Sequence, residues 1–167
     1  RALLANITTL SWSQGGSTIT QQVVKNSILT NNKDVSRKLK ELVLAVKLEQ
    51  IISKDEILSM YFNEIPYGGN IYGVEEASQA FFGKKSGDVT LSEAAYLAAL
   101  PKAPTFYSPY GKNKTKLDER KNLVLKEMLN NNFITKEEYS SAIAEKVSFV
   151  LKGDSGIKAP HFVFYVL

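Results

Sequence analysis

The 167-residue sequence contains no cysteine, one histidine and one tryptophan. The absence of cysteine excludes disulfide bonds and thiolate catalysis, and it says nothing about the cell compartment. The single histidine, His161, cannot form a cluster of metal ligands by itself, and we interpret it as structural. No apolar run approaches the roughly 20 residues of a membrane-spanning helix. No signal peptide is visible at the start of the sequence either.

The rest of the composition is that of an ordinary globular chain. Hydrophobic residues make up 44% of it and charged residues 23%, which is typical of a soluble fold. This length is enough for one domain with a sizeable core. The net charge is +4. Spread evenly, such a charge favours solubility, whereas a cluster of the basic residues would favour an anionic ligand.

Start and stop signals predict a mostly α-helical fold with at most a short β-hairpin. Capping boxes, in which Ser or Thr is followed three residues later by Glu, begin at Ser53, Thr90 and Thr135. Segments rich in Gly, Asn or Pro separate the expected helices, and the segment from Pro101 to Pro109 is expected to be extended. The expected helices span residues 18–29, 35–52, 53–63, 73–82, 90–100, 117–130 and 135–146.

One stretch of small and polar residues stands out because it carries no charge: Gly15-Gly16-Ser17-Thr18-Ile19-Thr20-Gln21-Gln22. Glycine lets a ligand approach the main chain closely, and Ser17 or Thr18 can cap a helix that begins there. The first N–H groups of that helix and its positive dipole end suit an anion or a sugar hydroxyl. Gln21 and Lys25 would place an amide and an ammonium group on one face of the helix.

The next expected helix has two apolar sides. One stripe consists of Leu39, Leu42, Val43 and Val46. The opposite side carries Arg37, Glu41, Leu44 and Leu48. Because two leucines follow Glu41 on its own face, we expect the helix to be covered on both sides, with Arg37 and Glu41 lining the wall of a cleft. The alternative is a simple ion pair between Arg37 and Glu41, worth a few tenths of a kcal/mol.

The uncharged stretch resembles the second signature motif of the family 51 glycosyltransferases, the peptidoglycan glycosyltransferase domains of class A penicillin-binding proteins and their monofunctional relatives. The third family motif, Arg-Lys-x-x-Glu, is matched by Arg37-Lys38-Leu39-Lys40-Glu41. The fourth, Lys-x-x-Ile-Leu-x-x-Tyr-x-Asn, is matched by Lys54, Ile57, Leu58, Tyr61 and Asn63. The fifth, an Arg-rich helix start, is matched by the segment from Arg120 to Leu125, with Lys121 in place of the usual second Arg. The resemblance covers essentially the whole chain.

The resemblance implies a lysozyme-like helical glycosyltransferase domain over residues 1–152. Residues 153–167 would then be an exit segment toward a transpeptidase domain in the same chain. The family's first motif, whose Glu is the general base, has no match in this sequence. We therefore expect that motif to lie upstream of Arg1, and the 167 residues alone to be inactive.

The implied chemistry is polymerisation of lipid II. The 4-hydroxyl of the acceptor sugar attacks C1 of the growing glycan, expels undecaprenyl pyrophosphate and inverts to a β-1,4 bond. The resemblance and the clustered positive charge assign binding of the sugars or the pyrophosphate to Ser17, Thr18, Gln21, Gln22, Lys25, Lys33, Arg37 and Lys38. Glu41 matches the family's second essential Glu, and we expect it to orient Arg37 and Lys38. Tyr61, Asn63 and Arg120 are expected to support the cleft.

The resemblance also bears on cofactors, partners and location. No cofactor is required, although a divalent ion, Mg²⁺ or Mn²⁺, near the pyrophosphate is an alternative role for Glu41. The expected partners are lipid II, the growing glycan chain, moenomycin-type inhibitors and the membrane surface at the outer face of the bacterial cell membrane; nucleic acid is not expected.

Two other functions stay open. One is a non-catalytic module that binds lipid-linked glycan or scaffolds partners. The other is a glycan-cleaving enzyme on a lysozyme-like fold. Cleavage needs a Glu in an apolar pocket beside the sugar bond, and a Glu41 surrounded by cations is badly placed for that role.

Overall fold

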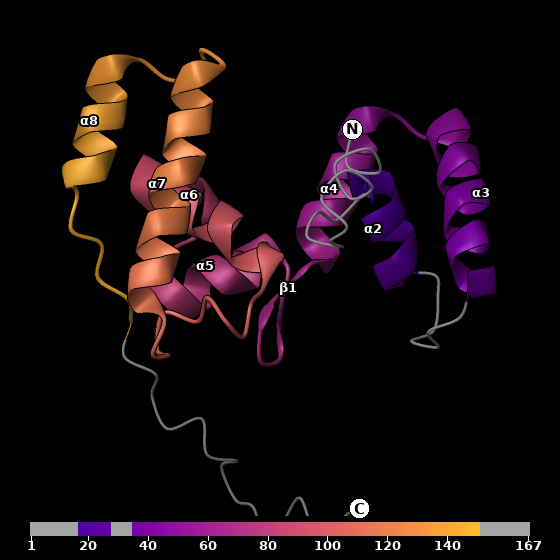
Figure 1. Cartoon of the computed structure of the whole chain (residues 1–167), viewed down its shortest axis with the longest axis horizontal. Helices are drawn as coiled ribbons and strands as arrows, with labels where there is room; N and C mark the ends of the chain where they lie inside the picture. Colours follow the sequence, from indigo (N-terminus) through magenta and orange to yellow (C-terminus); the bar gives the residue numbers. More distant parts are fainter. Residues whose placement is uncertain (1–16, 28–34, 151–167) are drawn as a thin grey trace, which may run out of the picture. The chain divides into compact units, whose positions relative to one another are not determined.

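The computed structural model describes residues 17–27 and 35–150, which form seven α-helices and one small two-stranded sheet (Figure 1). The helices are α2 (Ile19–Ser27), α3 (Val35–Ile51), α4 (Lys54–Glu64), α5 (Val74–Phe82), α6 (Leu91–Ala99), α7 (Lys114–Asn130) and α8 (Lys136–Ala144). Strands β1 (Pro66–Gly68) and β2 (Ile71–Tyr72) form a hairpin. The prediction of a mostly helical fold with a short hairpin is confirmed for these residues. None of the described helices combines the length and the apolar character that crossing a bilayer requires.

The chain divides into two compact units, and each is described by itself. The first unit comprises residues 1–66 and 72–74 and contains α2, α3 and α4. The second comprises residues 67–71 and 75–167 and contains the helices from α5 onward. A domain over residues 1–152 with an exit segment over 153–167 stays a prediction, because residues 151–167 lie outside the described part of the chain.

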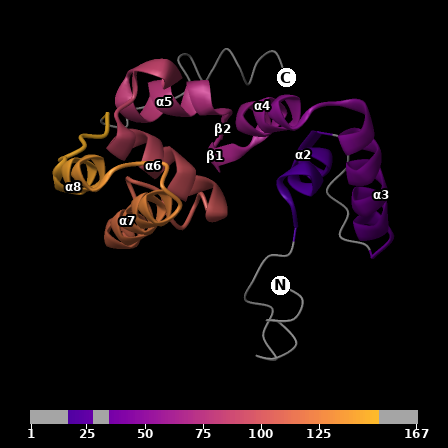
Figure 2. The same ribbon diagram turned by 90° about the horizontal axis from the view of Figure 1, so that it is seen from above.

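Helix α2 is the centre of the first unit. It lies between α3 and α4 and contacts both of them (Figures 1 and 2). Its two valines, Val23 and Val24, are completely buried, and Ala45 of α3 and Ile57 of α4 are buried as well. Because α2 has only nine residues, such a short helix depends on this packing rather than on intrinsic helix propensity.

The expectation that α3 is covered on both sides is wrong. Glu41 is only 2% exposed, whereas Leu39, Leu42, Val43 and Val46 of the apolar stripe are between 50% and 64% exposed. Within the first unit α3 packs mainly against α2, and the face turned toward it is the one that carries Glu41 and Ala45. The spacing of the apolar residues correctly predicts a helix. The stripe they form is nevertheless exposed, and the opposite face is the buried one.

The three predicted capping boxes are all present. The side chains of Ser53, Thr90 and Thr135 each accept a hydrogen bond from a backbone N–H three residues later, and the Glu at that position accepts one in return. Each box satisfies two N–H groups that the first helical turn leaves without intrahelical partners. The helices α4, α6 and α8 therefore begin where the letters predict.

The segment after α6 differs from the expectation of an extended chain. Residues Leu100–Lys102 form a 3₁₀ turn with Pro101 near its start, and the Tyr107 N–H donates to the Ala103 carbonyl at 2.9 Å. Proline is compatible with the first turn of a helix because no hydrogen bond from its nitrogen is needed there. Helix α7 also begins at Lys114, earlier than expected.

Gly73 belongs to the first unit and directly follows β2. Its backbone conformation and its surroundings leave no room for a side chain. Its φ is +81°, and its N–H donates to the Ile65 carbonyl at 3.0 Å. A Cβ atom here would lie 2.8 Å from the Asn63 carbonyl oxygen. Gly69 in the hairpin loop also has a positive φ, +58°, but a Cβ added there would meet nothing within 4 Å.

In the second unit, α7 packs against α6 and α8 (Figure 1). Their common core contains Ala95, Leu125 and Ala142. Partly buried side chains that pack against it are Leu91, Val124, Met128, Ile134, Tyr139 and Ile143.

Residues 145–150, the C-terminal strap, continue beyond α8 and are held at both ends. At one end the Thr90 hydroxyl donates to the Glu145 carboxylate at 2.7 Å. At the other, the Val150 N–H donates to the Phe81 carbonyl at 2.8 Å, and the Tyr110 hydroxyl donates to the Val150 carbonyl at 2.7 Å. The Phe149 ring lies 5.4 Å from the Phe82 ring and 5.2 Å from the Tyr96 ring.

Candidate anion-binding site

The start of α2 carries a fourth capping box, which is not among the three predicted from the sequence. The Gln21 N–H donates to the Thr18 hydroxyl at 3.2 Å, and the Thr18 N–H donates to the Gln21 side-chain oxygen at 3.1 Å. The letters follow the Thr-x-x-Gln form of the box, so the signal was present in the sequence. Thr18 rather than Ser17 is thus the cap, and the first turn of α2 contains no acidic residue that would offset its positive end.

An ammonium group from α3 lies beside this helix start. Lys38 Nζ donates to Ser17 Oγ at 2.7 Å and to Glu41 Oε2 at 2.6 Å. Glu41 is buried, whereas the Lys38 side chain is exposed, so the carboxylate fixes one side of an ammonium group that solvent or a ligand can still reach. Short contacts between charged groups of this kind are among the stronger hydrogen bonds in proteins.

The pairing of Arg37 with Glu41 is looser. Arg37 Nε lies 3.6 Å from Glu41 Oε1, which is too long for a hydrogen bond. Both atoms are buried, and neither has a hydrogen-bond partner within the described residues. A buried polar atom without a partner costs free energy. Arg37 Nε and Glu41 Oε1 are therefore the atoms of this cluster whose hydrogen bonding is incomplete.

The structure brings Ser17, Arg37, Lys38 and Glu41 together, but it does not do so for every predicted cation. Lys25 is exposed in the last turn of α2 and makes no ion pair with a described residue. Gln22 is partly buried on the same helix. Lys33 lies outside the described residues. The binding roles of Gln22, Lys25 and Lys33 stay predictions.

The described residues around Glu41 do not fit a divalent cation. Mg²⁺ and Ca²⁺ are bound by several oxygen ligands, whereas Glu41 is one carboxylate whose partners are an ammonium and a guanidinium group. In the part of the chain that the structure describes, no group of three or more His, Cys, Asp and Glu side chains could hold a metal ion.

Two of the residues expected to support the cleft lie on α4. Tyr61 is partly buried, burial raises the pKa of its hydroxyl, and its ring lies 5.7 Å from that of Phe62. The Asn63 side chain bonds back to its own helix, with Nδ2 donating to the Ser59 carbonyl at 3.0 Å. Their supporting role stays a prediction.

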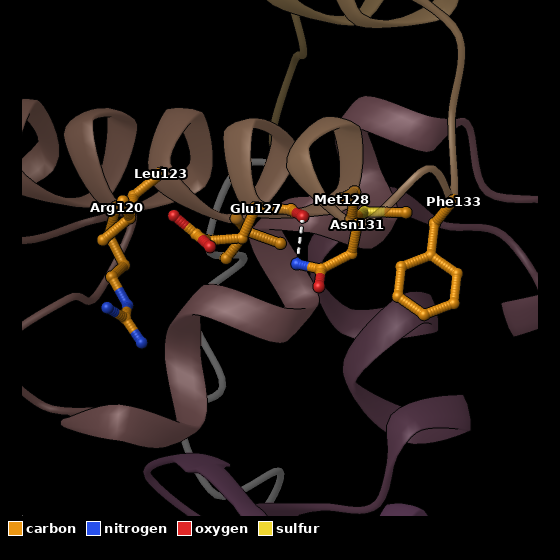
Figure 3. Close-up of a pocket in the computed structure, with 7 residues that line it drawn as sticks. Arg120, Leu123, Glu127, Met128, Asn131 and Phe133 are labelled. Carbon is orange, nitrogen blue, oxygen red and sulfur yellow. Dashed lines mark hydrogen bonds between the residues drawn. The ribbon is translucent and has the colours of Figure 1, made fainter.

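Arg120, the third supporting residue, lies in the second unit on α7. It borders a pocket of about 330 Å³, shown in Figure 3. The other residues that line it are Leu123, Val124, Glu127, Met128, Asn131 and Phe133. Arg120 Nε is buried and has no hydrogen-bond partner among the described residues. Asn131 Nδ2 donates to the Glu127 carbonyl at 2.7 Å at the other end of the pocket (Figure 3).

Two residues without a predicted role, Thr20 and Glu49, also hold the start of α2. Thr20 Oγ1 donates to Glu49 Oε1 at 2.5 Å, and Glu49 Oε2 pairs with Lys54 Nζ at 2.6 Å. Thr20 belongs to the uncharged stretch, but nothing in the letters links it to a carboxylate on another helix.

The family model and the relatives that match this chain agree with one another. A family model described as transglycosylase matches residues 1–129. Penicillin-binding protein 1A of Vibrio cholerae is 48% identical over 147 residues, covering 88% of this chain and 18% of the relative. Penicillin-binding protein 1A of Aquifex aeolicus is 47% identical over 143 residues, covering 86% of this chain and 20% of the relative.

A solved structure agrees with these relatives. The crystal structure of penicillin-binding protein 1A from Haemophilus influenzae matches with a TM-score of 0.51 and 30% sequence identity, over 80% of this chain and 17% of that chain. The chain therefore spans a fifth or less of the length of these relatives.

Proposed function

Because this chain belongs to the transglycosylase family, we propose that it is part of a peptidoglycan glycosyltransferase that polymerises lipid II into β-1,4 glycan strands. In this reaction C1 of the growing glycan is inverted and undecaprenyl pyrophosphate is released. The residues of the first unit supply the binding site for that pyrophosphate and the sugars next to it.

The charges around α2 suit this reaction better than glycan hydrolysis. A glycosidase generally needs two carboxyl groups, one of which protonates the departing sugar oxygen. Pyrophosphate is already a good leaving group and mainly needs its negative charge to be stabilised. Positive groups held in advance where charge develops supply that stabilisation without reorganisation during the reaction.

The observation that carries the proposal is the position of Lys38. Its ammonium group bridges Ser17, at the start of α2, and the buried Glu41 of α3. A fixed cation and the positive end of a helix dipole thus meet at one place, and both favour an anion. Glu41 orients this cation. Both carboxylate oxygens of Glu41 face cationic side chains, Lys38 at 2.6 Å and Arg37 at 3.6 Å.

A second candidate function is binding of lipid-linked glycan without transfer. It is favoured for the 167 residues alone, because the motif that supplies the family's general base has no match in them. The two candidates differ in one assay. A version extended upstream by a segment carrying that motif should polymerise lipid II, and the 167-residue chain should bind lipid II without polymerising it. Failure of the extended version to polymerise lipid II would favour the binding function.

The cation site has its own test. Lys38→Met should weaken binding of moenomycin, a phosphoglycolipid, to the 167-residue chain by roughly tenfold or more, since a hydrogen bond to a charged group is worth about 1.5–3 kcal/mol. Lys40→Met is the matched control, because Lys40 is an exposed lysine of the same helix. Isothermal titration calorimetry measures both affinities. Equal effects of the two substitutions would refute a specific role for Lys38.

The remaining parts of the proposal concern partners and place. We propose lipid II and the growing glycan chain as substrates, moenomycin-type compounds as inhibitors, and the outer face of the bacterial cell membrane as the location. A transpeptidase domain in the same chain is proposed on the strength of the family, whose relatives found here are much longer.

A further inference from the structure

Glu49 joins three helices through two short contacts. One carboxylate oxygen accepts a hydrogen bond from Thr20 of α2 at 2.5 Å, and the other pairs with Lys54, the first residue of α4, at 2.6 Å. Glu49 itself lies in the last turn of α3. All three residues belong to the first unit.

Two hydrogen bonds connect α3 to the start of α2, Lys38 to Ser17 and Thr20 to Glu49, and they are widely spaced along α3. Lys38 and Glu49 lie about 16 Å apart along the helix axis at 1.5 Å per residue. Their partners, Ser17 and Thr20, are close neighbours at the beginning of α2. The start of α2 is therefore held at two points along α3. Each hydrogen bond restrains a rotation of α2 about the other one.

The surroundings of Thr20 and Glu49 favour the hydrogen bond between them. Thr20 is only 4% exposed, and a buried hydroxyl needs a hydrogen-bond partner. The hydrogen bonds from Lys54 and Thr20 lower the pKa of Glu49, so its carboxylate is ionised at neutral pH. The negative charge would otherwise disfavour an anionic ligand nearby, but Lys54 balances it.

We propose that Glu49 is a positioning residue, which through Thr20 holds the first turn of α2 in the orientation that an anionic ligand requires. The inference rests on the proposed function, because the ligand is the pyrophosphate end of the donor or a phosphoglycolipid that resembles it. Glu49 itself does not contact the ligand. It fixes the N–H groups at the start of α2 relative to the ammonium group of Lys38.

The test measures moenomycin affinity of the 167-residue chain with substitutions on both sides of the contact. Thr20→Val removes the hydroxyl, Thr20→Ser keeps it, and Glu49→Met removes the acceptor. Glu119→Met is the control, because Glu119 forms an exposed ion pair with Lys116 in the other unit. Circular dichroism confirms that each variant is folded, and amide hydrogen exchange follows the N–H groups at the start of α2.

The proposal predicts a specific pattern. Thr20→Val and Glu49→Met should each weaken moenomycin binding by about three- to tenfold, the equivalent of one hydrogen bond. The double variant should be no weaker than the worse single variant, since both remove the same contact. Thr20→Ser should bind like the original chain, and amide exchange at the start of α2 should accelerate only in the weak-binding variants.

Three results would overturn it. Folded Thr20→Val with unchanged affinity would remove the positioning role while leaving the proposed function intact. Thr20→Ser as weak as Thr20→Val would mean that the methyl packing, and not the hydroxyl, matters. No moenomycin binding by the original chain would count against the proposed function itself, and the inference would fall with it. If Glu49→Met does not fold, the comparison of the two Thr20 variants still decides.

Discussion

Substitution of Gly73 by Ala adds a single methyl group, but it should destabilise the first unit considerably. The φ of +81° costs a residue with a side chain about 1–2 kcal/mol. In addition, the new Cβ would lie 2.8 Å from the Asn63 carbonyl oxygen, and relief of such overpacking costs about 1–3 kcal/mol. Because the neighbour is backbone at the end of α4, it cannot rotate away. The expected loss is therefore about 2–5 kcal/mol in total.

Gly69→Ala separates the two contributions. Its φ is also positive, but a Cβ there meets nothing within 4 Å, so only the backbone cost of about 1–2 kcal/mol applies. Urea denaturation followed by circular dichroism measures both losses from the midpoint and the slope. If the two alanine variants lose the same stability, the close approach of Gly73 to Asn63 carries no energy and the reasoning is refuted.

Two further predictions concern stability. Leu125→Ala should cost about 2–5 kcal/mol in thermal or urea unfolding, because it leaves a cavity at a completely buried position; a loss below about 1 kcal/mol would mean that the core of the second unit collapses to fill the space. Hydrogen bonds from Ser53 hold the pKa of Glu56 below its usual value of 4.5, so the stability it contributes is present above that value and lost as the pH falls through the lowered pKa. Glu56→Gln should therefore make unfolding less sensitive to pH in that acidic range, and an unchanged pH profile would contradict this assignment.

The helix boundaries that could be predicted are those set by neighbouring residues. The boxes at Ser53, Thr90 and Thr135 involve residues three positions apart, so the letters contain all the participants. The same rule covers Thr18 and Gln21, whose letters fit the Thr-x-x-Gln form of the box, although the family motif points to ligand binding for Gln21. Its side-chain oxygen in fact closes the cap.

The buried face of α3 could not be predicted, because periodicity shows that a helix has an apolar side and not what covers it. The stripe of Leu39 and Val43 is more apolar than the face of Glu41, yet α2 packs on the latter. Glu41 is buried there with a charged partner, because Lys38 donates to its carboxylate and also to Ser17. Such a choice depends on which helix arrives as a neighbour, and local spacing contains no information about that.

Part of the candidate site could be predicted from the family motifs and part could not. The motifs include Ser17, Lys38 and Glu41, whose side chains lie in hydrogen-bond contact in the structure; their binding role stays a prediction. Glu49 was not found, because its partner Thr20 lies far away in the sequence and the contact exists only after α2 and α3 have packed. The same limit applies to Arg120, whose position in the second unit beside a mostly apolar pocket follows from tertiary packing.

The C-terminal strap has a mechanical consequence. Tension applied to the chain after residue 150 would first load the Val150–Phe81 backbone hydrogen bond, the Tyr110 hydroxyl and the ring contacts of Phe149 with Phe82 and Tyr96. Helix α8 would feel the pull only after these had yielded. The second unit therefore transmits an external force into α5 and into the segment that carries Tyr110, and the end of α8 is loaded later.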